Sequence, residues 1–343
     1  MAIYVRPVDY TSEHKELLAL LETNLPKLPH ARRLQWLYRA NPDGPAWSWF
    51  VHDSESDEIV GTASVFPHSL WVGGESRLCG QVGDFAISPK YRSLGPNLLL
   101  HRTTFELVDR GMLAFCYDCT ANEKGMATFR RLGMRPQCSV ERHALPLRMD
   151  ARLGKIRGLS VLAPVANALL RLQRRRKSSS KGLEISEHLG AFGEEFSHLD
   201  TALRNPQSIR VRRSAEVLNW RYRQDPLQQH QVFTARRSGE LRAFVVFHIT
   251  GGEATIVDLF GTEQPNAGLA LLEAVVERCE PSCQTIHAFL ASGSEMAGVH
   301  VNAGFRPRQS TTQVVAYAKP GSEVADFLED SRRWAFSGVD IWA

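Results

Sequence analysis

The sequence predicts an α/β (α+β) protein of two similar halves, each a mixed, mostly antiparallel sheet flanked by helices. Three observations predict this fold class. The chain has 343 residues, which suggests two domains of roughly 150 residues each. An apolar strand, a tight glycine turn and a helix follow one another between Val82 and Leu100. A nine-residue pattern occurs once in each half, which indicates an internal repeat.

The repeat has the pattern L-[QN]-W-x-Y-R-x-[ND]-P. It spans Leu34–Pro42 and recurs at Leu218–Pro226. A second matching pair is Leu132–Pro136 and Ala303–Pro307. Each copy of the first pattern precedes a predicted hairpin, so the order of elements also repeats.

The elements of the first half follow from apolar periodicity and from turn residues. Leucines at helical spacing predict a helix over 13–25 that ends before Pro26, and Asn41–Gly44 ends a second helix over 31–39. In chain order, the further predictions are an opening strand 3–6, hairpin strands 47–52 and 59–66, an edge 69–72 with 77–79, strand 82–87, a helix after Gly95, strand 113–119 and helix 123–132. The second half is predicted to carry a hairpin over 231–249 and a strand followed by a helix start over 257–268.

The stretch from Val82 to Leu100 predicts an anion site. Pro89 ends the strand because its ring removes a backbone N–H. The N–H groups of a helix's first turn have no intrahelical partners and lie at the positive end of the helix dipole. Gly95 allows close approach to the backbone and Arg92 adds positive charge, so a phosphate group fits this loop.

These residues resemble a known motif, the V-x-P-x-Y-R-x-x-G-x-G/A signature of the GNAT superfamily of acyl-CoA-dependent N-acyltransferases. Here it reads Ile87-Ser88-Pro89-Lys90-Tyr91-Arg92-Ser93-Leu94-Gly95. The resemblance implies tandem GNAT folds with splayed sheets and a cofactor that is acetyl-CoA or another acyl-CoA. In that family the loop holds the pyrophosphate and the strand end pairs with pantetheine. The cofactor-binding residues that the resemblance implies are Ala86, Ile87, Arg92, Ser93, Leu94, Gly95, Asn97, Leu98 and Asn122.

The sequence departs from the family pattern at three positions. The last motif position is Asn97 instead of Gly or Ala, and Pro96 supplies one amide fewer. The family's usual acid is a Tyr on a later helix, and Phe129 stands at that position. A phenyl ring cannot donate a proton, so either another group such as Tyr117 helps the thiolate to leave, or the site is impaired.

For a catalytic base, Asp84 is the carboxylate on strand 82–87. The alternative for Asp84 is a structural acid that binds an amide or an arginine. Family members with a base on this strand often keep a Glu earlier in it, where Gln81 stands here. His68, His101 and His143 are isolated in the sequence, and each is expected at the surface or in packing.

Composition excludes several classes of protein. The 43% hydrophobic residues form no apolar run of the roughly 20 residues that a membrane span needs, and no export signal is recognised, so a cytoplasmic protein is expected. The six cysteines do not form a disulfide framework in a chain of this length. Cys116 and Cys119 lie three apart on a predicted strand and face opposite sides, so no metal site is expected.

The net charge of +4 is concentrated in a connector at 151–182. This segment carries nine Lys or Arg and no Asp or Glu, which leaves −5 on the remaining residues. It lacks the aromatic residues of a nucleic-acid face, so no nucleic-acid partner is expected. Two interpretations remain open: a linker helix docked on one domain, or a basic amphipathic helix on an anionic membrane surface.

The predicted organisation is an N-terminal GNAT domain at 1–150 with the acyl-CoA loop, the basic helical linker at 151–182, and a degenerate GNAT-like domain at 183–343. The second domain lacks an Arg at the motif position. The aromatic tail at 334–343 is expected to be held by packing. It resembles the ends of tandem GNAT proteins of bacterial polysaccharide or glycoconjugate gene clusters.

The resemblance implies an N-acyltransferase that moves an acyl group, most simply acetyl, from acyl-CoA to a primary amine of a small molecule. An amino sugar is one acceptor of this kind, and a protein amine is another. The alternatives are a non-catalytic acyl-CoA-binding protein and a scaffold that works through the basic linker. The sequence does not determine the oligomeric state.

Overall fold

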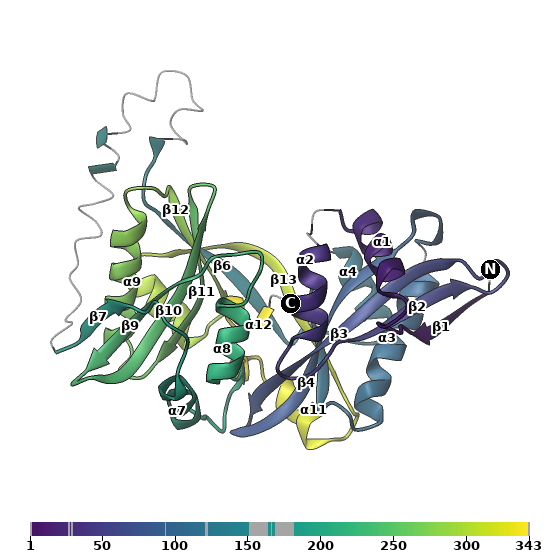
Figure 1. The fold of residues 1–343 in the computed structure, drawn as a ribbon. Coiled ribbons are helices and arrows are strands. Elements are labelled where there is room, and N and C mark those ends of the chain that lie inside the picture. The colour runs from purple at the N-terminus through teal and green to yellow at the C-terminus, as the bar shows by residue number, and fades with distance from the viewer. Residues whose placement is uncertain are drawn as a thin grey trace.

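The computed structural model describes residues 2–26, 28, 30–92, 94–120, 123–150, 164–165, 167–168 and 182–341. Within these residues the strands form one sheet of 13 strands, with helices on its faces (Figure 1). The strand order is β1-β2-β3-β4-β5-β13-β6-β12-β11-β10-β9-β7, and β8 pairs with β3. The predicted fold class, a mixed and mostly antiparallel sheet flanked by helices, is confirmed.

The N-terminal half follows the predicted order, with longer strands in its central hairpin. Its elements are β1 (Ile3–Pro7), α1 (His14–Asn24), α2 (His30–Arg33), a π-helical turn η1 (Leu34–Arg39), β2 (Trp47–Asp53), β3 (Ile59–Val72), β4 (Glu75–Ile87), the short turn η2 (Pro89–Tyr91), α3 (Leu94–Asp109), β5 (Phe115–Thr120), α4 (Glu123–Arg131) and β6 (Cys138–Pro146). The predicted breaks within 59–72 and 75–87 are absent, because each segment forms one continuous strand.

The C-terminal half repeats this order. Its elements are β7 (Glu184–Glu187), α7 (Glu194–Ala202), β8 (Ile209–Val211), α8 (Ala215–Tyr222), β9 (Gln231–Arg237), β10 (Glu240–Thr250), β11 (Glu253–Gly261), α9 (Asn266–Cys279), β12 (Thr285–Ala291), α10 (Glu295–Asn302), β13 (Arg306–Ala318), α11 (Glu323–Leu328), η4 (Ser331–Arg333) and α12 (Gly338–Ile341). The predicted hairpin at 231–249 is confirmed. Both residues of its loop, Ser238 and Gly239, have positive φ, as a tight hairpin turn requires.

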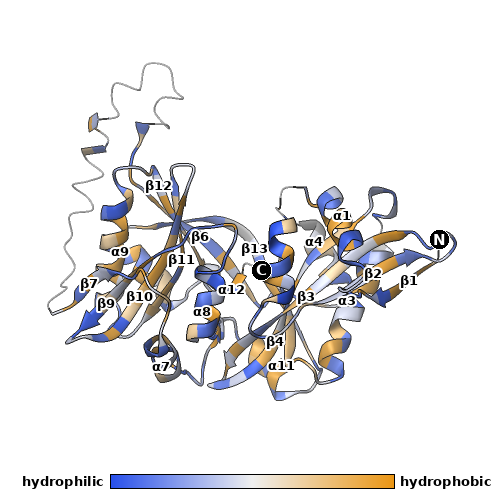
Figure 2. Ribbon diagram, in the orientation of Figure 1, coloured by the Kyte–Doolittle hydropathy of each residue, from blue (hydrophilic) through white to orange (hydrophobic). Residues whose placement is uncertain are grey.

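Each half buries apolar residues on both faces of its part of the sheet, and Figure 2 shows apolar stretches along the strands of both halves. In the first half, α3 and α4 cover one face, and α1 with η1 covers the other. In the second half, α9 and α10 cover one face, and α7 with α8 covers the other. The equivalent helices therefore lie on equivalent faces, which agrees with the repeat in the sequence.

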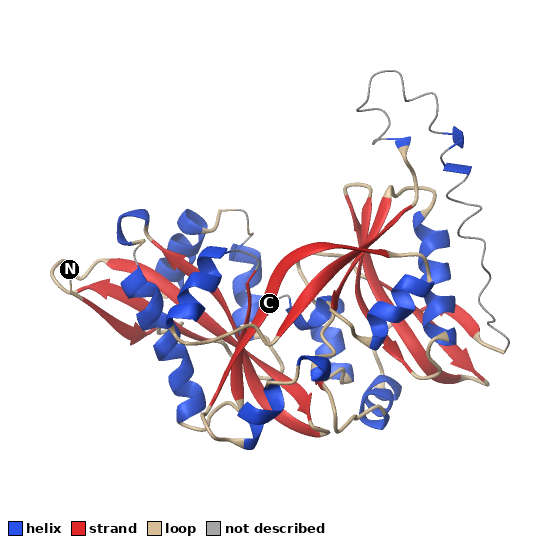
Figure 3. Cartoon of the chain, turned by 180° about the vertical axis from the view of Figure 1, so that it is seen from behind, coloured by secondary structure: helices blue, strands red, loops and turns tan. Residues whose placement is uncertain are grey.

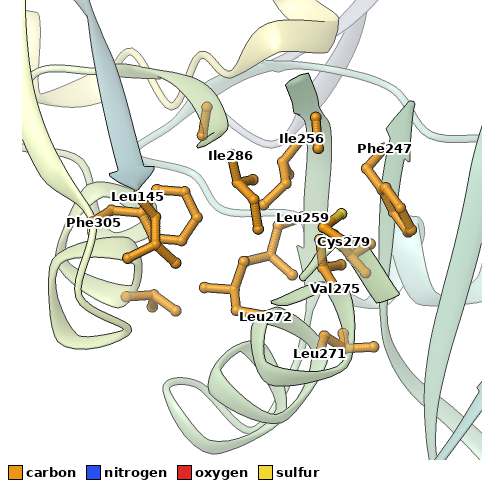
Figure 4. Close-up of a cluster of buried hydrophobic side chains, with 14 of the residues drawn as sticks. Leu145, Phe247, Ile256, Leu259, Leu271, Leu272, Val275, Cys279, Ile286 and Phe305 are labelled. Carbon is orange, nitrogen blue, oxygen red and sulfur yellow. The ribbon is translucent and has the colours of Figure 1, made fainter. Parts of the chain in front are cut away.

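The two halves exchange strands at their junction. β6 pairs with β12 over seven residue pairs and with β13, while β13 also pairs with β5. The long strands at the junction are seen from behind in Figure 3. Leu145 of β6 accordingly packs in the core of the second half beside Ile286 and Phe305 (Figure 4). The domain limits at 1–150 and 183–343 stay a prediction. Strands of one half pair with strands of the other across these limits.

The two copies of the repeat meet at a reciprocal contact. The indole Nε1 of Trp36 donates to the carbonyl of Trp220 at 2.9 Å, and the indole Nε1 of Trp220 donates to the carbonyl of Trp36 at 3.1 Å. The two rings stack with their centroids 5.1 Å apart. The repeated tryptophan therefore joins the halves through one symmetric pair of hydrogen bonds.

Replacing either tryptophan should destabilise the junction. We expect Trp220→Ala to lower the free energy of unfolding by about 3–5 kcal/mol, since a large buried side chain is lost. The double variant Trp36→Ala, Trp220→Ala should lose about 1–2 kcal/mol less than the sum of the single changes, because the rings contact each other. Urea unfolding of the four proteins measures this coupling, and strictly additive losses would contradict it.

Three further predictions concern the cysteines, the basic linker and membrane-spanning helices. Cys116 packs under α3 and Cys119 packs on the opposite face, as predicted, and all six cysteines are free. The basic linker falls outside the described residues at 151–163, 166 and 169–181, so both interpretations of it stay open. Among the described helices, none is long and apolar enough to cross a membrane.

Candidate active site

The sheet opens between two parallel strands of the first half. β4 and β5 pair only at Gly80 with Cys116 and at Gln81 with Tyr117. Beyond these pairs β4 continues to Ile87 with no paired strand on that edge among the described residues. Backbone N–H and C=O groups on an unpaired strand edge can bind an extended ligand. The opening is therefore the place where the predicted pantetheine site and the predicted loop come together.

The loop after β4 is the predicted anion site. The strand ends at Ile87, η2 forms a short turn, and α3 begins at Leu94. The Arg92 guanidinium donates from Nε to the carbonyl of Ile87 at 2.9 Å and from Nη2 to Asn24 Oδ1 at 3.4 Å. Gly95 is exposed in the first turn of α3. The backbone N–H groups of a helix's first turn have no intrahelical partners, and Arg92 adds positive charge beside this turn.

The other predicted cofactor residues surround this turn. Ala86 is buried and Ile87 is half-buried on the last residues of β4, while Leu98 is half-buried on α3. The structure places the backbone of Leu94 at the start of α3. Ser93 and Asn122 lie outside the described residues, so their assignments stay predictions.

Two residues that depart from the family pattern lie between the helices that flank the opening. Asn97 of α3 donates from Nδ2 to Thr128 Oγ1 of α4 at 2.8 Å. Phe129, also on α4, is buried in the apolar cluster beneath the two helices. The long side chain at the last motif position thus joins α3 to α4, and no hydroxyl stands at the position of the usual acid.

The predicted base, Asp84, is held by two partners. Arg33 Nη1 lies 3.1 Å from its Oδ2, and the Tyr38 hydroxyl donates to the same oxygen at 2.5 Å. Asp84 has a φ of +48°, in the left-handed region, and the register of β3 with β4 shifts between Thr62 and Ser64. Its carboxylate is almost fully buried in this ion pair. Burial beside Asp84 also raises the pKa of Tyr38 well above its usual range.

The second half contains the same arrangement. Asp258 on β11 accepts from Arg213 Nε at 2.9 Å and from the Tyr222 hydroxyl at 3.5 Å. Tyr222 and Tyr38 occupy the same position in the repeat. Because a buried Tyr–Asp–Arg set also occurs in the half that lacks the motif arginine, the geometry favours the structural alternative for Asp84.

The other predicted catalytic residue, Tyr117, faces away from the loop. Its ring packs 5.4 Å from that of Phe336, and its hydroxyl donates to the carbonyl of Asp340 at 3.2 Å. Burial raises the pKa of Tyr117 well above its usual range. Gln81, its partner at the last β4–β5 pair, donates to the carbonyl of Ile341 at 3.1 Å. The catalytic role of Tyr117 stays a prediction, and the contacts give it a role in holding the C-terminal segment.

The C-terminal segment fills the corresponding opening of the second half. β11 and β12 are parallel and pair only as far as Ile256 and Ala288. Past this point the carbonyl of Phe336 accepts from the N–H of Ala291 at 2.7 Å, and Ser337 bridges to β12. The predicted packing of the aromatic tail is confirmed as far as residue 341, whereas Trp342 and Ala343 lie outside the described residues.

The loop of the second half is also unlike an anion site. Glu263 stands in it, paired with Arg237 at 2.7 Å and with Arg242 at 3.7 Å. The Gln264 side chain lies over Gly268 in the first turn of α9, so it takes up the space there. An incoming phosphate would meet a carboxylate and a filled turn in this half.

Two polar residues at the first opening, His101 and Asp118, were not assigned a role in the site from the sequence. His101, expected at the surface or in packing, is on α3 and is buried where this helix contacts α4. Asp118 follows the last β4–β5 pair, and burial raises its pKa to about 7. Neither belongs to a sequence motif, so only their positions in the fold identify them. Among the described residues, no group of three or more His, Cys, Asp or Glu could hold a metal ion.

Comparison with known proteins rests on structure alone. No family model matches the sequence, and no curated protein matches it. A probable N-acyltransferase of Enterococcus faecalis V583 superposes with a TM-score of 0.69 at 14% identity, over 93% of this chain and 73% of that one. A tandem GNAT protein from the clavulanic acid biosynthesis pathway superposes with a TM-score of 0.55 at 14% identity, over 94% of this chain and 100% of that one. The chain has the tandem GNAT fold.

A third similar structure is that of an N-myristoyltransferase. Saccharomyces cerevisiae N-myristoyltransferase with bound myristoyl-CoA superposes with a TM-score of 0.58 at 13% identity, over 100% of this chain and 85% of that one. Identities this low show the fold alone, since one fold can carry several activities. The activity of this chain must therefore be argued from its own residues.

Proposed function

We propose that this chain is an acyl-CoA-dependent N-acyltransferase that moves an acyl group, most simply acetyl, to a primary amine of a small molecule. The cofactor is acetyl-CoA or another acyl-CoA. Arg92 and the first turn of α3, including Gly95, would hold the pyrophosphate. The edge of β4 at Ala86 and Ile87 would pair with the pantetheine arm.

The observation that carries this proposal is the opening of β4 from β5 directly before the loop with Arg92 and Gly95. The second half supports it by contrast, because there the C-terminal segment and Glu263 take up the equivalent places. An unpaired strand edge and a basic loop in the first half thus correspond to the C-terminal segment and a carboxylate in the second half. An amino sugar is proposed as the acceptor from the sequence resemblance of the tail.

Calorimetric titration with acetyl-CoA, longer acyl-CoAs and free CoA tests the cofactor site. We expect saturable binding by the wild type and binding at least about 30-fold weaker by Arg92→Ala, Gly95→Asp. This loss corresponds to about 2 kcal/mol, the value of one hydrogen bond to a charged group. Arg92 is exposed and Gly95 lies at the helix start, so the folded state should persist.

Arg242→Ala, on β10 of the second half beside Glu263 of the corresponding loop, is the control and should bind acyl-CoA as the wild type does. Equal binding by the Arg92, Gly95 double variant and the wild type would place the cofactor elsewhere. Where the wild type binds, a screen of amines by release of free thiol tests turnover. Acyl-CoA binding without turnover on any primary amine would favour the non-catalytic alternative, which Phe129 and the Asn97–Thr128 contact also favour.

A further inference from the structure

His101 lies where three elements of the candidate site meet. It is on the second turn of α3, and its side chain is 3% exposed. Its ring stacks on Phe85 with the centroids 4.3 Å apart, and it contacts Phe129 at 4.6 Å. Phe85 follows Asp84 on the part of β4 that does not pair with β5, and Phe129 is on α4. The imidazole therefore lies over the opening of the sheet, beside the ring that replaces the usual acid.

The imidazole is a polar group in an apolar cluster. Its Nδ1 is buried and has no hydrogen-bond partner among the described residues. Buried polar side chains are nearly always hydrogen-bonded, because an unmade bond costs about 1–3 kcal/mol. Phe85, Phe105 and Phe129 surround the ring, so a further phenyl ring would fit the cluster without this cost. A ligand in the opening would supply the partner that the described residues do not.

The protonation state of His101 suits a hydrogen-bond donor. Burial lowers its pKa to about 4, so the ring is neutral near pH 7. A neutral imidazole carries one N–H and can donate it without releasing the proton. The alternatives nearby are less suitable, since Tyr117 faces the other side of the sheet and Asp118, with a pKa of about 7, donates only in the fraction that is protonated.

We propose that His101 donates a hydrogen bond to the sulfur of the departing coenzyme A thiolate, in place of the hydroxyl that Phe129 lacks. This inference rests on the proposed acyltransferase function. The amine nitrogen attacks the thioester carbonyl carbon, the C–N bond forms, and the C–S bond breaks with its electron pair on sulfur. The nitrogen loses one proton to solvent, and the thiolate finally takes one proton from solvent, so His101 is unchanged.

The test compares ligands with and without sulfur. We expect wild-type protein to bind free CoA more tightly than desulfo-CoA at a pH where the bound thiol is ionised, and His101→Phe to lose this difference. The pKa of the bound CoA thiol, followed by thiolate absorbance, should be lower in the wild type than in His101→Phe. Acyl transfer should fall about 100-fold in His101→Phe, the effect of removing one donor from a developing anion.

Two further variants separate this role from packing. The double variant His101→Phe, Phe129→Tyr should regain most of the lost transfer, because a hydroxyl returns to the same cluster. His300→Phe removes another buried imidazole, one that lies beside Phe305 in the second half, and should leave the CoA to desulfo-CoA ratio unchanged. His101→Asn keeps an N–H donor and covers the case in which the Phe variant does not fold.

The outcomes distinguish this inference from the proposed function. If the wild type binds neither CoA nor desulfo-CoA, the proposed function fails and this inference with it. If both ligands bind and His101→Phe keeps the wild-type ratio, thiol pKa and transfer rate, only the role of His101 is overturned. If His101→Phe loses the difference in affinity between CoA and desulfo-CoA, and the added Phe129→Tyr change restores acyl transfer, the role of His101 is supported.

Discussion

Lowering the pH from 7 to 5 is expected to remove about 6 kcal/mol from the free energy of unfolding. Four imidazoles cause most of this loss. Burial lowers the pKa values of His68 and His230 to about 3 and the pKa values of His101 and His300 to about 4. The Arg221 guanidinium beside His68 and His143 beside His300 act in the same direction.

The sign of the effect follows from proton binding. An unfolded histidine has a pKa of about 6.5, so between that value and the folded pKa only the unfolded state binds the proton. The stability from each buried neutral ring is present above pH 6.5 or so and is lost as the pH falls towards the folded value, by about 2 kcal/mol per ring at pH 5. Asp118 acts oppositely, because its folded pKa is raised to about 7, and offsets at most about 2 kcal/mol.

Urea unfolding midpoints at pH 7, 6 and 5 measure this dependence. His68→Gln removes one of the four rings, so its profile should be flatter by about one quarter of the histidine contribution. Arg110→Ala changes an exposed i,i+4 pair and should leave the slope unaltered. A midpoint that stays constant or rises on acidification would show that the rings are not neutral and buried in solution.

The fold was predictable where a local pattern determines a local structure. Pro89 and Gly95 predict the strand, turn and helix of the candidate site, and the repeated Trp36 and Trp220 predict that the halves are alike. The structure confirms the mixed sheet flanked by helices in both. The exchange of β6 and β13 was not predictable in this way, because alternation along a strand determines its faces and not its neighbours.

The candidate site was predictable only along its continuous loop. Arg92 and Gly95 lie in one motif, so their proximity follows from the chain itself. The partners of Asp84 are Arg33 and Tyr38, which are 51 and 46 residues away in the sequence. His101 has no motif at all, and its place beside Phe129 depends on how α3 packs against α4. Contacts between distant elements have no signature in local spacing, so the structure alone could assign them.

Asp84→Asn is expected to destabilise the protein by about 3–5 kcal/mol while the folded fraction keeps its turnover within a few-fold. The amide can still accept from Tyr38, but the buried Arg33 loses its carboxylate. Asn also tolerates the left-handed backbone of this position better than most residues, so the change tests the charge rather than the strain. The loss should therefore appear in the urea midpoint and leave the rate per folded molecule nearly intact.

The sister carboxylate supplies the control that separates a structural acid from a catalytic base. Asp258→Asn removes one of the two carboxylates beside Arg213, the other being Asp340 at 3.7 Å, in the half whose opening is filled, so it can affect stability and not proton transfer at the first site. If Asp84 is structural, both variants should lose stability, and neither should shift the pH dependence of kcat/KM. If Asp84 is the base, its variant alone should lose about 100-fold or more in turnover at unchanged acyl-CoA affinity. Asp84 and Asp258 each have their own Tyr and Arg partners, so each variant leaves a buried arginine beside a lost charge. A difference in turnover between the two variants therefore reports the chemistry of the first half and not the cost of a buried charge.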